Sequence, residues 1–207
     1  MRIVVFGAGG RAGRQAVAEA RRRGHQVTAV VRNPAGHGDL TDVQVVAGDV
    51  TDAVSVARAA AGHDAAVSAA VDLSVAPHDF FTTSSRALAA GLDKAGVRRL
   101  VVVGLASIMP GASGAALMDQ PGYPNEYRSF YLGHAAGLDE LRASDLDWAY
   151  LAPAGDFDHD GTRTGHYRIA EHGDPASRIS YADFAIALVD EIEAPRHHRA
   201  AASVREV

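Results

Sequence analysis

The stretch I-V-V-F-G-A-G-G-R-A-G, residues 3–13, decides how the rest of the chain is interpreted. Its first four residues are apolar, which predicts a short buried strand over Ile3–Phe6. A glycine-rich turn follows directly, and helix-face spacing then continues from about Arg11 to Arg23, with Gly24 as the stop signal. The sequence therefore predicts a strand, an open turn and a helix in immediate succession.

The same alternation continues through the first half of the chain. Further strands are predicted at residues 27–31, 43–47, 65–71 and 100–103, and helices at 53–61 and 82–95. The strands are apolar throughout rather than alternating, so both faces of the sheet are expected to be covered. Strands separated by helices are parallel and joined by right-handed crossovers. We therefore predict an α/β fold of the Rossmann type, with a doubly wound, mostly parallel sheet.

The glycines after the first strand favour binding of a dinucleotide diphosphate. Glycine lets the chain turn sharply and leaves backbone N–H groups open to a phosphate, which the amino end of the next helix also attracts. The turn lies inside a βαβ unit, which is the context that this motif requires. The predicted diphosphate-binding residues are Gly7, Gly9, Gly10, Arg11, Ala12 and Gly13.

The end of the second strand favours NADP(H) over NAD(H). Proteins that bind NAD usually carry a carboxylate there, whereas this strand ends in Val30-Val31-Arg32-Asn33. A guanidinium at Arg32 can hold a 2′-phosphate through two hydrogen bonds, and Arg11 adds a second positive charge. The alternative for Arg32 is a solvated arginine at a strand end.

The second half of the chain is less regular. Residues 104–131 show little periodicity, which is typical of a binding loop or lid. Helices are predicted at 134–143 and 181–193, strands at 148–152, 166–170 and 200–204, and a polar loop at 155–165. No repeat or linker interrupts the pattern. We predict one domain over residues 1–207, with a cofactor half at about 1–104 and a smaller substrate-side half at about 105–207.

Composition excludes several other classes of protein. The net charge of −5 argues against nucleic acid and anionic membranes as partners, and there is no cysteine for disulfides or thiolate chemistry. The apolar runs are too short to span a bilayer. Because a strand begins at once, no signal peptide is expected and the predicted location is cytoplasmic. The oligomeric state, monomer or dimer, stays open.

Several segments together resemble one family. They are G-A-G-G-R-A-G (7–13), V-V-R-N-P (30–34), G-D-V-T-D (48–52), V-V-V-G (101–104), Y-P-N-E-Y (123–127), D-W (147–148) and R-I-S-Y-A-D (178–183). The chain thereby resembles atypical short-chain dehydrogenases/reductases of the NAD(P)H-binding, NmrA-like and flavin/biliverdin-reductase-like group.

That resemblance implies further cofactor contacts. Asp49 and Val50 would flank the adenine, and the small residues Ser68, Ala69 and Ala70 would pass beside the cofactor ribose. The alternatives are a helix N-cap role for Asp49 or Thr51 and simple close packing for the alanines.

The Tyr-x-x-x-Lys pair of the best-known members of the superfamily is absent. None of the tyrosines at 123, 127 and 131 has a lysine four residues on, and the only lysine, Lys94, lies near the end of the helix before the fifth strand. Candidate catalytic residues are therefore Ser107, to bond a substrate carbonyl, Tyr127, to donate or stack, and His134, to supply a proton near neutral pH. For each, a structural role is an equally good hypothesis.

No metal site is predicted. Asp156 to Gly161 begins like an EF-hand loop, but Tyr167 stands where the bidentate Glu belongs. His197 and His198 lack companions at ligand spacing and are expected in a solvated turn.

The leading functional hypothesis is an NADPH-dependent oxidoreductase that reduces a small flavin-like or carbonyl/enone acceptor by direct hydride transfer. The alternatives are a non-enzymatic NADP(H) sensor and an epimerase or lyase of the same fold.

Overall fold

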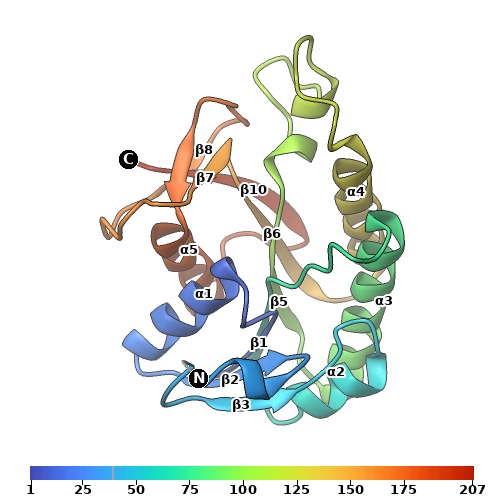
Figure 1. Cartoon of the computed structure of the whole chain (residues 1–207), viewed down its shortest axis with the longest axis vertical. Coiled ribbons are helices and arrows are strands. Elements are labelled where there is room, and N and C mark those ends of the chain that lie inside the picture. The colour runs from blue at the N-terminus through green and yellow to red at the C-terminus, as the bar shows by residue number, and fades with distance from the viewer. Residues whose placement is uncertain (39) are drawn as a thin grey trace.

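Within the part of the chain that the structure describes, residues 1–38 and 40–207 of a computed structural model, eight strands form one sheet in the order β3-β2-β1-β4-β5-β6-β10-β8 (Figure 1). These strands are β1 (Arg2–Phe6), β2 (Gln26–Val31), β3 (Gln44–Ala47), β4 (Ala65–Ser68), β5 (Arg99–Val103), β6 (Asp147–Pro153), β10 (Ala200–Arg205) and β8 (Arg168–Ala170). All neighbours are parallel except β8, which runs antiparallel to β10.

The chain winds outward from β1 in both directions. It passes first to β2 and β3, and then crosses back to β4 on the other side of β1. A sheet whose strand order reverses in this way leaves a crevice at the carboxyl ends of the two strands at the reversal. The predicted fold class is confirmed, and the crevice is at β1 and β4.

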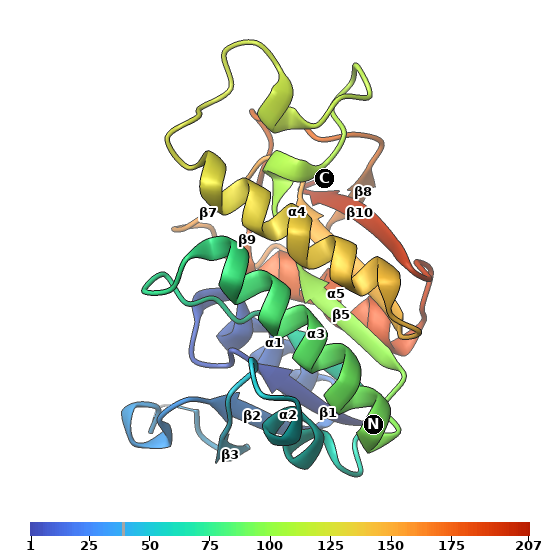
Figure 2. The ribbon, with the colours of Figure 1, turned by 90° about the vertical axis from the view of Figure 1, so that its right-hand side faces the viewer.

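Helices cover both faces of the sheet. One face carries α1 (Arg11–Arg22) and α5 (Tyr181–Glu193), and the other carries α2 (Ala53–Ala60), α3 (Pro77–Ala95) and α4 (Arg128–Ala143) (Figure 1). Figure 2 looks onto the second face, where α3 and α4 lie side by side. None of the helices in the described residues is long and apolar enough to cross a membrane.

Strand β1 shows why its sequence is apolar at every position. Ile3 and Val5 belong to the hydrophobic cluster under α1 and α5, whereas Val4 and Phe6 belong to the cluster under α2, α3 and α4. All four side chains are at most 1% exposed. Because side chains alternate across a strand, a two-sided core requires an unbroken apolar run.

Several boundaries differ from those predicted. Helix α3 begins at Pro77, five residues early, because proline is well suited to the first helical position. Helix α4 begins at Arg128 rather than His134, so Tyr131 belongs to a helix and not to the preceding loop. Strand β4 ends at Ser68, so Ala69 and Ala70 start a loop.

The segments predicted as loops contain short regular pieces. Short 3-10 helices cover Ala106–Ile108 and Leu117–Asp119. Strands β7 (Asp156–Asp158) and β9 (Arg178–Ser180) pair in parallel as a separate two-stranded sheet. Three-residue pieces of this kind are too short to show a hydrophobic period in the sequence.

A buried carboxylate on α1 joins three parts of the fold. Glu19 is 4% exposed and accepts hydrogen bonds from the arginines at 22, 23 and 163. Arg23 also binds Asp190 and Glu193 of α5. Burial opposes ionisation of Glu19, but the hydrogen bonds from the three arginines outweigh it and lower the pKa of Glu19 to about 2. This carboxylate therefore ties α1 to α5 and to the loop before β8.

Glu19→Gln is expected to destabilise the protein in a pH-dependent way. Because the folded-state pKa lies below the unfolded value, the stabilisation is fully present above about pH 4.5 and is lost as the pH falls towards 2. We expect the variant to lose at most about 3 kcal/mol of unfolding free energy at pH 7 and progressively less below pH 4.5. Urea unfolding of both proteins at several pH values measures this difference.

Asp139→Asn is the control, because Asp139 pairs with Arg142 on the exposed face of α4. An exposed pair should change the unfolding free energy by less than about 1 kcal/mol. A loss in Glu19→Gln that is the same at pH 3 and pH 7 would contradict the assignment.

Candidate cofactor site

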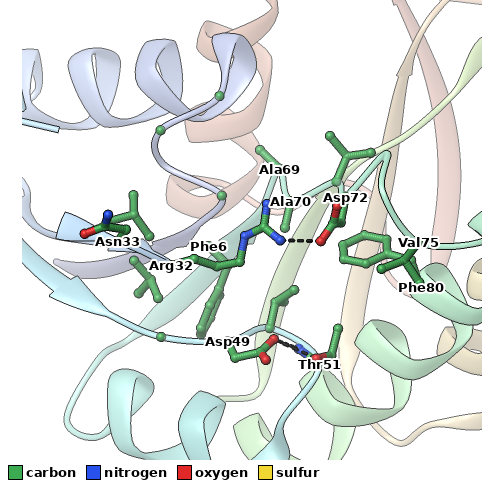
Figure 3. A pocket seen from close by; sticks show the side chains of 18 of the residues that line it. Phe6, Arg32, Asn33, Asp49, Thr51, Ala69, Ala70, Asp72, Val75 and Phe80 are labelled. Carbon is green, nitrogen blue, oxygen red and sulfur yellow. Dashed lines mark hydrogen bonds and ion pairs between the residues drawn. The ribbon is translucent and has the colours of Figure 1, made fainter. Parts of the chain in front are cut away.

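A cavity of about 670 Å³ opens at the carboxyl edge of the sheet, where β1, β2, β3 and β4 end (Figure 3). Its lining residues are Phe6, Gly7, Gly9, Gly10, Val30, Val31, Arg32, Asn33, His37, Gly48, Asp49, Val50, Thr51, Ala69, Ala70, Val71, Asp72, Val75, Asp79, Phe80 and Thr83. The cavity therefore occupies the crevice that the strand order creates.

The turn after β1 requires glycine at two positions. Gly7 has φ of +74°, and a Cβ there would lie 2.6 Å from backbone atoms of Ala69 and Ala70. A Cβ on Gly13 would lie 2.1 Å from the carbonyl oxygen of Gly7. The first glycine allows the chain to turn beside β4, and the last lets α1 pack against the end of β1.

The amino end of α1 borders the cavity. Gly10 is the N-cap residue, and neither it nor a carboxylate in the first turn satisfies the helix N–H groups. A Cβ on Gly10 would meet only the Gly7 carbonyl oxygen, at 3.5 Å, so the cavity side of this residue is open. Backbone amides at an uncapped helix start with an open approach are what a diphosphate requires.

Three of the residues predicted for this turn do not line the cavity. Arg11, Ala12 and Gly13 form the start of α1, and Gly13 is buried against Gly7. The Arg11 guanidinium contacts the Nδ1 atom of His159, in the loop after β7. The Arg11 side chain, which the sequence predicts as a second positive charge at the cofactor, therefore bonds to a histidine far along the chain.

The end of β3 and the start of the β4–α3 loop form the opposite side. Asp49, Val50, Ala69 and Ala70 all line the cavity, and their contact with a cofactor stays a prediction. The Asp49 carboxylate accepts from the Thr51 N–H at 2.8 Å and from its hydroxyl at 2.6 Å, so its orientation is fixed.

The alternative N-cap role does not fall on Asp49 or Thr51. The N-cap of α2 is Asp52, which accepts from the Val54 N–H, and not Asp49 or Thr51. Ser68 is 6% exposed and lines a separate small cavity of about 30 Å³ behind the sheet edge. Ser68 therefore does not line the large cavity, whereas Ala69 and Ala70 do.

Arg32 lies where the sequence predicts a 2′-phosphate contact. It follows β2, lines the cavity and is 68% exposed. Its guanidinium forms an ion pair with Asp72, in the loop between β4 and α3 (Figure 3). In addition, His37 lies over Gly9 and bonds to Arg14, whose Nε atom donates to the Gly9 carbonyl.

Asp72 and His37 are site residues that the sequence reasoning missed. Asp72 comes directly after the strand predicted at residues 65–71, and a polar residue in that position lies at the same edge as the glycine turn. That signal was present for Asp72. The placement of His37 depends on the short 3-10 helix Pro34–Gly36, which no periodicity announces.

Ser107 belongs to a cluster of three hydroxyl groups beyond the end of β5. Its side chain is 4% exposed, and its Oγ atom lies 3.0 Å from the Tyr123 hydroxyl. The Tyr123 and Tyr131 rings meet edge to face with centroids 5.9 Å apart. Burial raises the pKa of Tyr131 above its usual range, so its phenol stays protonated at neutral pH. Tyr123 and Tyr131 were not predicted as site residues.

His134 is in a different environment from the one expected. It is 9% exposed, its ring centroid lies 3.8 Å from that of Phe81 with the two rings tilted by 37°, and its Nδ1 atom lies 2.9 Å from the Tyr150 hydroxyl. Burial lowers the pKa of His134 to about 3. The ring is therefore neutral at physiological pH, which corrects the expectation that it titrates near pH 7. Its catalytic role stays a prediction.

Tyr127 is 64% exposed at the start of α4 and lies outside the lining of the cavity. Of the histidines predicted in a solvated turn, His197 bonds to Glu191 at 2.8 Å and is largely buried, whereas His198 bonds to Asp147 at the surface. Among the described residues, no group of three or more His, Asp or Glu side chains is arranged to hold a metal ion.

The cavity fits a nicotinamide dinucleotide on three counts. Open backbone amides lie at a helix start, apolar walls of Val50, Ala69 and Phe80 suit an aromatic base, and an arginine stands at the rim.

Comparison with known proteins agrees with this fit. A family model described as NAD(P)H-binding matches residues 7–195. The uncharacterized protein YwnB of Bacillus subtilis (strain 168) is 38% identical over 209 residues, which cover 95% of this chain and 94% of YwnB.

Two solved structures share the fold over the full chain. A Burkholderia pseudomallei protein, provisionally named an exported protein, is 40% identical, with 99% of each chain covered and a TM-score of 0.86. A Streptococcus pneumoniae TIGR4 protein, provisionally named an NADH-flavin reductase, is 32% identical, with 100% of each chain covered and a TM-score of 0.86.

The cytoplasmic location stays a prediction. The chain belongs to the NAD(P)H-binding family, with a Rossmann-type fold and reductase-like relatives.

Proposed function

We propose that the protein is an NADPH-dependent oxidoreductase that reduces a small flavin-like, carbonyl or enone acceptor by direct hydride transfer. The observation that carries the proposal is the cavity itself, which has open amides at α1, an apolar wall and Arg32 at the rim. The Streptococcus pneumoniae relative that is named an NADH-flavin reductase supports the reaction class. Arg32 supports NADPH as the reductant, because a guanidinium matches a 2′-phosphate.

The protein's own groups would bind and orient the reactants. Amides at the start of α1 would hold the diphosphate, while Asp49 and Ala69 would border the adenosine. The nicotinamide, when bound, supplies the hydride to an acceptor stacked on it. Ser107 and Tyr131 lie outside the lining of that cavity, and their hydroxyls would donate a hydrogen bond to a carbonyl oxygen of an acceptor held beyond the end of β5.

Acceptors that need little proton transfer suit this site best. No lysine stands near Tyr131, since Lys94 lies in the last turn of α3, at the amino end of β5. Burial keeps the Tyr131 phenol neutral, so it is not prepared to act as the ionised tyrosine of a Tyr-x-x-x-Lys pair. Flavins, quinones and activated enones are therefore preferred over simple ketones.

The direct test is NADPH oxidation with a panel of flavins, quinones, enones and aldehydes. We expect turnover with at least one planar acceptor and slower turnover with NADH. Tight cofactor binding without turnover of any acceptor would contradict the proposal and favour the non-enzymatic sensor. Conversion of a substrate without net change in nicotinamide absorbance would favour an epimerase or lyase.

Ser107→Ala is expected to distinguish the acceptor classes. Loss of one hydrogen bond to a carbonyl oxygen should lower kcat/KM for carbonyl and enone acceptors about tenfold. Flavin reduction should change less than about twofold, since a flavin stacks and needs little from a hydroxyl donor. Steady-state kinetics with both classes measures this difference.

Ser113→Ala is the matched control, because Ser113 is an exposed serine of the same loop that only accepts from Ala115 N–H at 3.4 Å. It should leave both activities unchanged. Equal losses for both acceptor classes in Ser107→Ala would indicate that Ser107 only supports the loop.

A further inference from the structure

Of the carboxylates that line the cavity in the described residues, Asp72 is the one paired with Arg32. It comes from the β4–α3 loop, whereas Arg32 follows β2, and β1 lies between those two strands in the sheet. Figure 3 shows the guanidinium extended across the cavity to the carboxylate. The group that the sequence predicts for a 2′-phosphate thus already has an anionic partner.

The two partners differ in how firmly they are held. Oδ1 of Asp72 accepts from the N–H of Ser74 at 2.9 Å and from its hydroxyl at 2.6 Å. Oδ2 is the atom that pairs with Arg32. The Asp72 side chain is 14% exposed and that of Arg32 is 68% exposed. Asp72 is therefore the fixed partner, and the long arginine side chain is the one that can move.

We propose that Asp72 is an internal counter-ion that competes with the 2′-phosphate of NADP(H) for the Arg32 guanidinium, and so limits the preference of the site for NADP(H) over NAD(H). The inference rests on the proposed function in that it takes a nicotinamide dinucleotide as the ligand. It adds Asp72 as a residue that lowers the preference for NADP(H) over NAD(H) by competing with the 2′-phosphate.

On binding of NADP(H), the Arg32 guanidinium exchanges one anionic partner, Asp72, for another, the 2′-phosphate. To hold a 2′-phosphate through two hydrogen bonds, the Arg32 guanidinium must turn its donors away from Asp72, and the cost of breaking that pair is subtracted from the phosphate contact. The Asp72 charge also repels a phosphate bound beside it. NADH carries a hydroxyl there and leaves the Arg32–Asp72 pair intact.

Asp72→Asn separates competition from loop structure. Asparagine keeps an Oδ1 acceptor for Ser74, and its amide in place of Oδ2 no longer attracts the guanidinium. An ion pair with one exposed partner is worth up to about 1 kcal/mol, so we expect the NADPH dissociation constant to fall by about three- to fivefold. The NADH dissociation constant should change less than about twofold.

The measurement is calorimetric titration of wild type and variant with NADPH, NADH and 2′,5′-ADP, which carries the 2′-phosphate without the nicotinamide. The 2′,5′-ADP dissociation constant should fall with that of NADPH. In an Arg32→Ala background, Asp72→Asn should give less than about half of its effect on NADPH, because the guanidinium is gone and only charge repulsion remains.

Two further variants serve as controls for Asp72→Asn. Asp79→Asn removes another carboxylate that lines the cavity and is not paired with Arg32. It should tighten NADPH by less than Asp72→Asn does, because its charge acts on the phosphate only through screened repulsion. Ser74→Ala removes the hydroxyl that orients the Asp72 carboxylate but keeps the ion pair with Arg32. It should lower the NADPH dissociation constant by a smaller factor than Asp72→Asn does.

An equal change for NADPH and NADH in Asp72→Asn, or weaker NADPH binding, would overturn the inference and leave Asp72 as a residue of the loop. The inference is also overturned if Asp72→Asn lowers the NADPH dissociation constant by the same factor in the Arg32→Ala background as in the wild type. Failure of wild type to bind either dinucleotide would instead remove the proposed function itself, so the two failures are distinguishable.

Discussion

Replacing Arg32 by alanine is expected to weaken NADPH binding by between about 10- and 100-fold and NADH binding by less than about threefold. Hydrogen bonds to a charged group contribute about 1.5–3 kcal/mol, and that range corresponds to the expected loss. The 2′-phosphate is the only difference between the two ligands. Removal of the arginine also leaves Asp72 unpaired beside the phosphate, which adds repulsion.

Arg32→Lys and Arg21→Ala complete this experiment. Lysine keeps the charge but not the two-pronged geometry, so it should restore only part of the NADPH affinity. Arg21 pairs with Asp42, and its loss should affect neither ligand. Equal weakening of NADPH and NADH by Arg32→Ala would remove the case for recognition of a 2′-phosphate.

Gly7→Ala is expected to abolish cofactor binding and to destabilise the fold by about 3 kcal/mol or more. Positive φ at Gly7 costs an alanine about 1 kcal/mol. The remainder comes from the Cβ atom, which would lie 2.6 Å from the backbone of Ala69 and Ala70. Backbone at the end of β4 cannot move aside without disturbing the β1–β4 pairing, so the turn and the cavity wall would shift together.

Gly96→Ala is the matched control for this substitution. Gly96 has φ of +73°, almost the value at Gly7, but a Cβ there meets nothing within 4 Å. It ends α3, away from the cavity. We expect a loss of about 1 kcal/mol in unfolding free energy and unchanged NADPH affinity. Equal behaviour of the two variants would show that the turn tolerates a Cβ and is not a phosphate cradle.

The fold of the first half was predictable because its signals are local. Helix α1 and strand β2 are found within one residue of their predicted bounds, since each is bracketed by glycine or by polar residues. Helix α4 was predicted late because its first turn, Arg128–Tyr131, carries no capping side chain and two aromatic residues. Strand β9 is too short for a period to show.

The sequence could predict which residues follow a strand at the edge that carries the glycine turn, but not which of them contact one another. Gly7, Gly10 and Arg32 follow from the motif and its spacing, whereas the Arg32–Asp72 contact joins residues 40 positions apart. The neutral state of His134 depends on Phe81 and Tyr150, which come from two other elements. Spacing along a chain shows which edge of a sheet a residue occupies, but not which side chains bury it.

The central claim is that the amides at the start of α1 hold the diphosphate of a nicotinamide dinucleotide. Calorimetric titration of the purified protein with NADPH and with NADH tests it most directly. The account predicts saturable binding of one dinucleotide per chain, with NADPH tighter than NADH and both lost in Gly7→Ala. No heat of binding from either dinucleotide, or undiminished binding in Gly7→Ala, would contradict it.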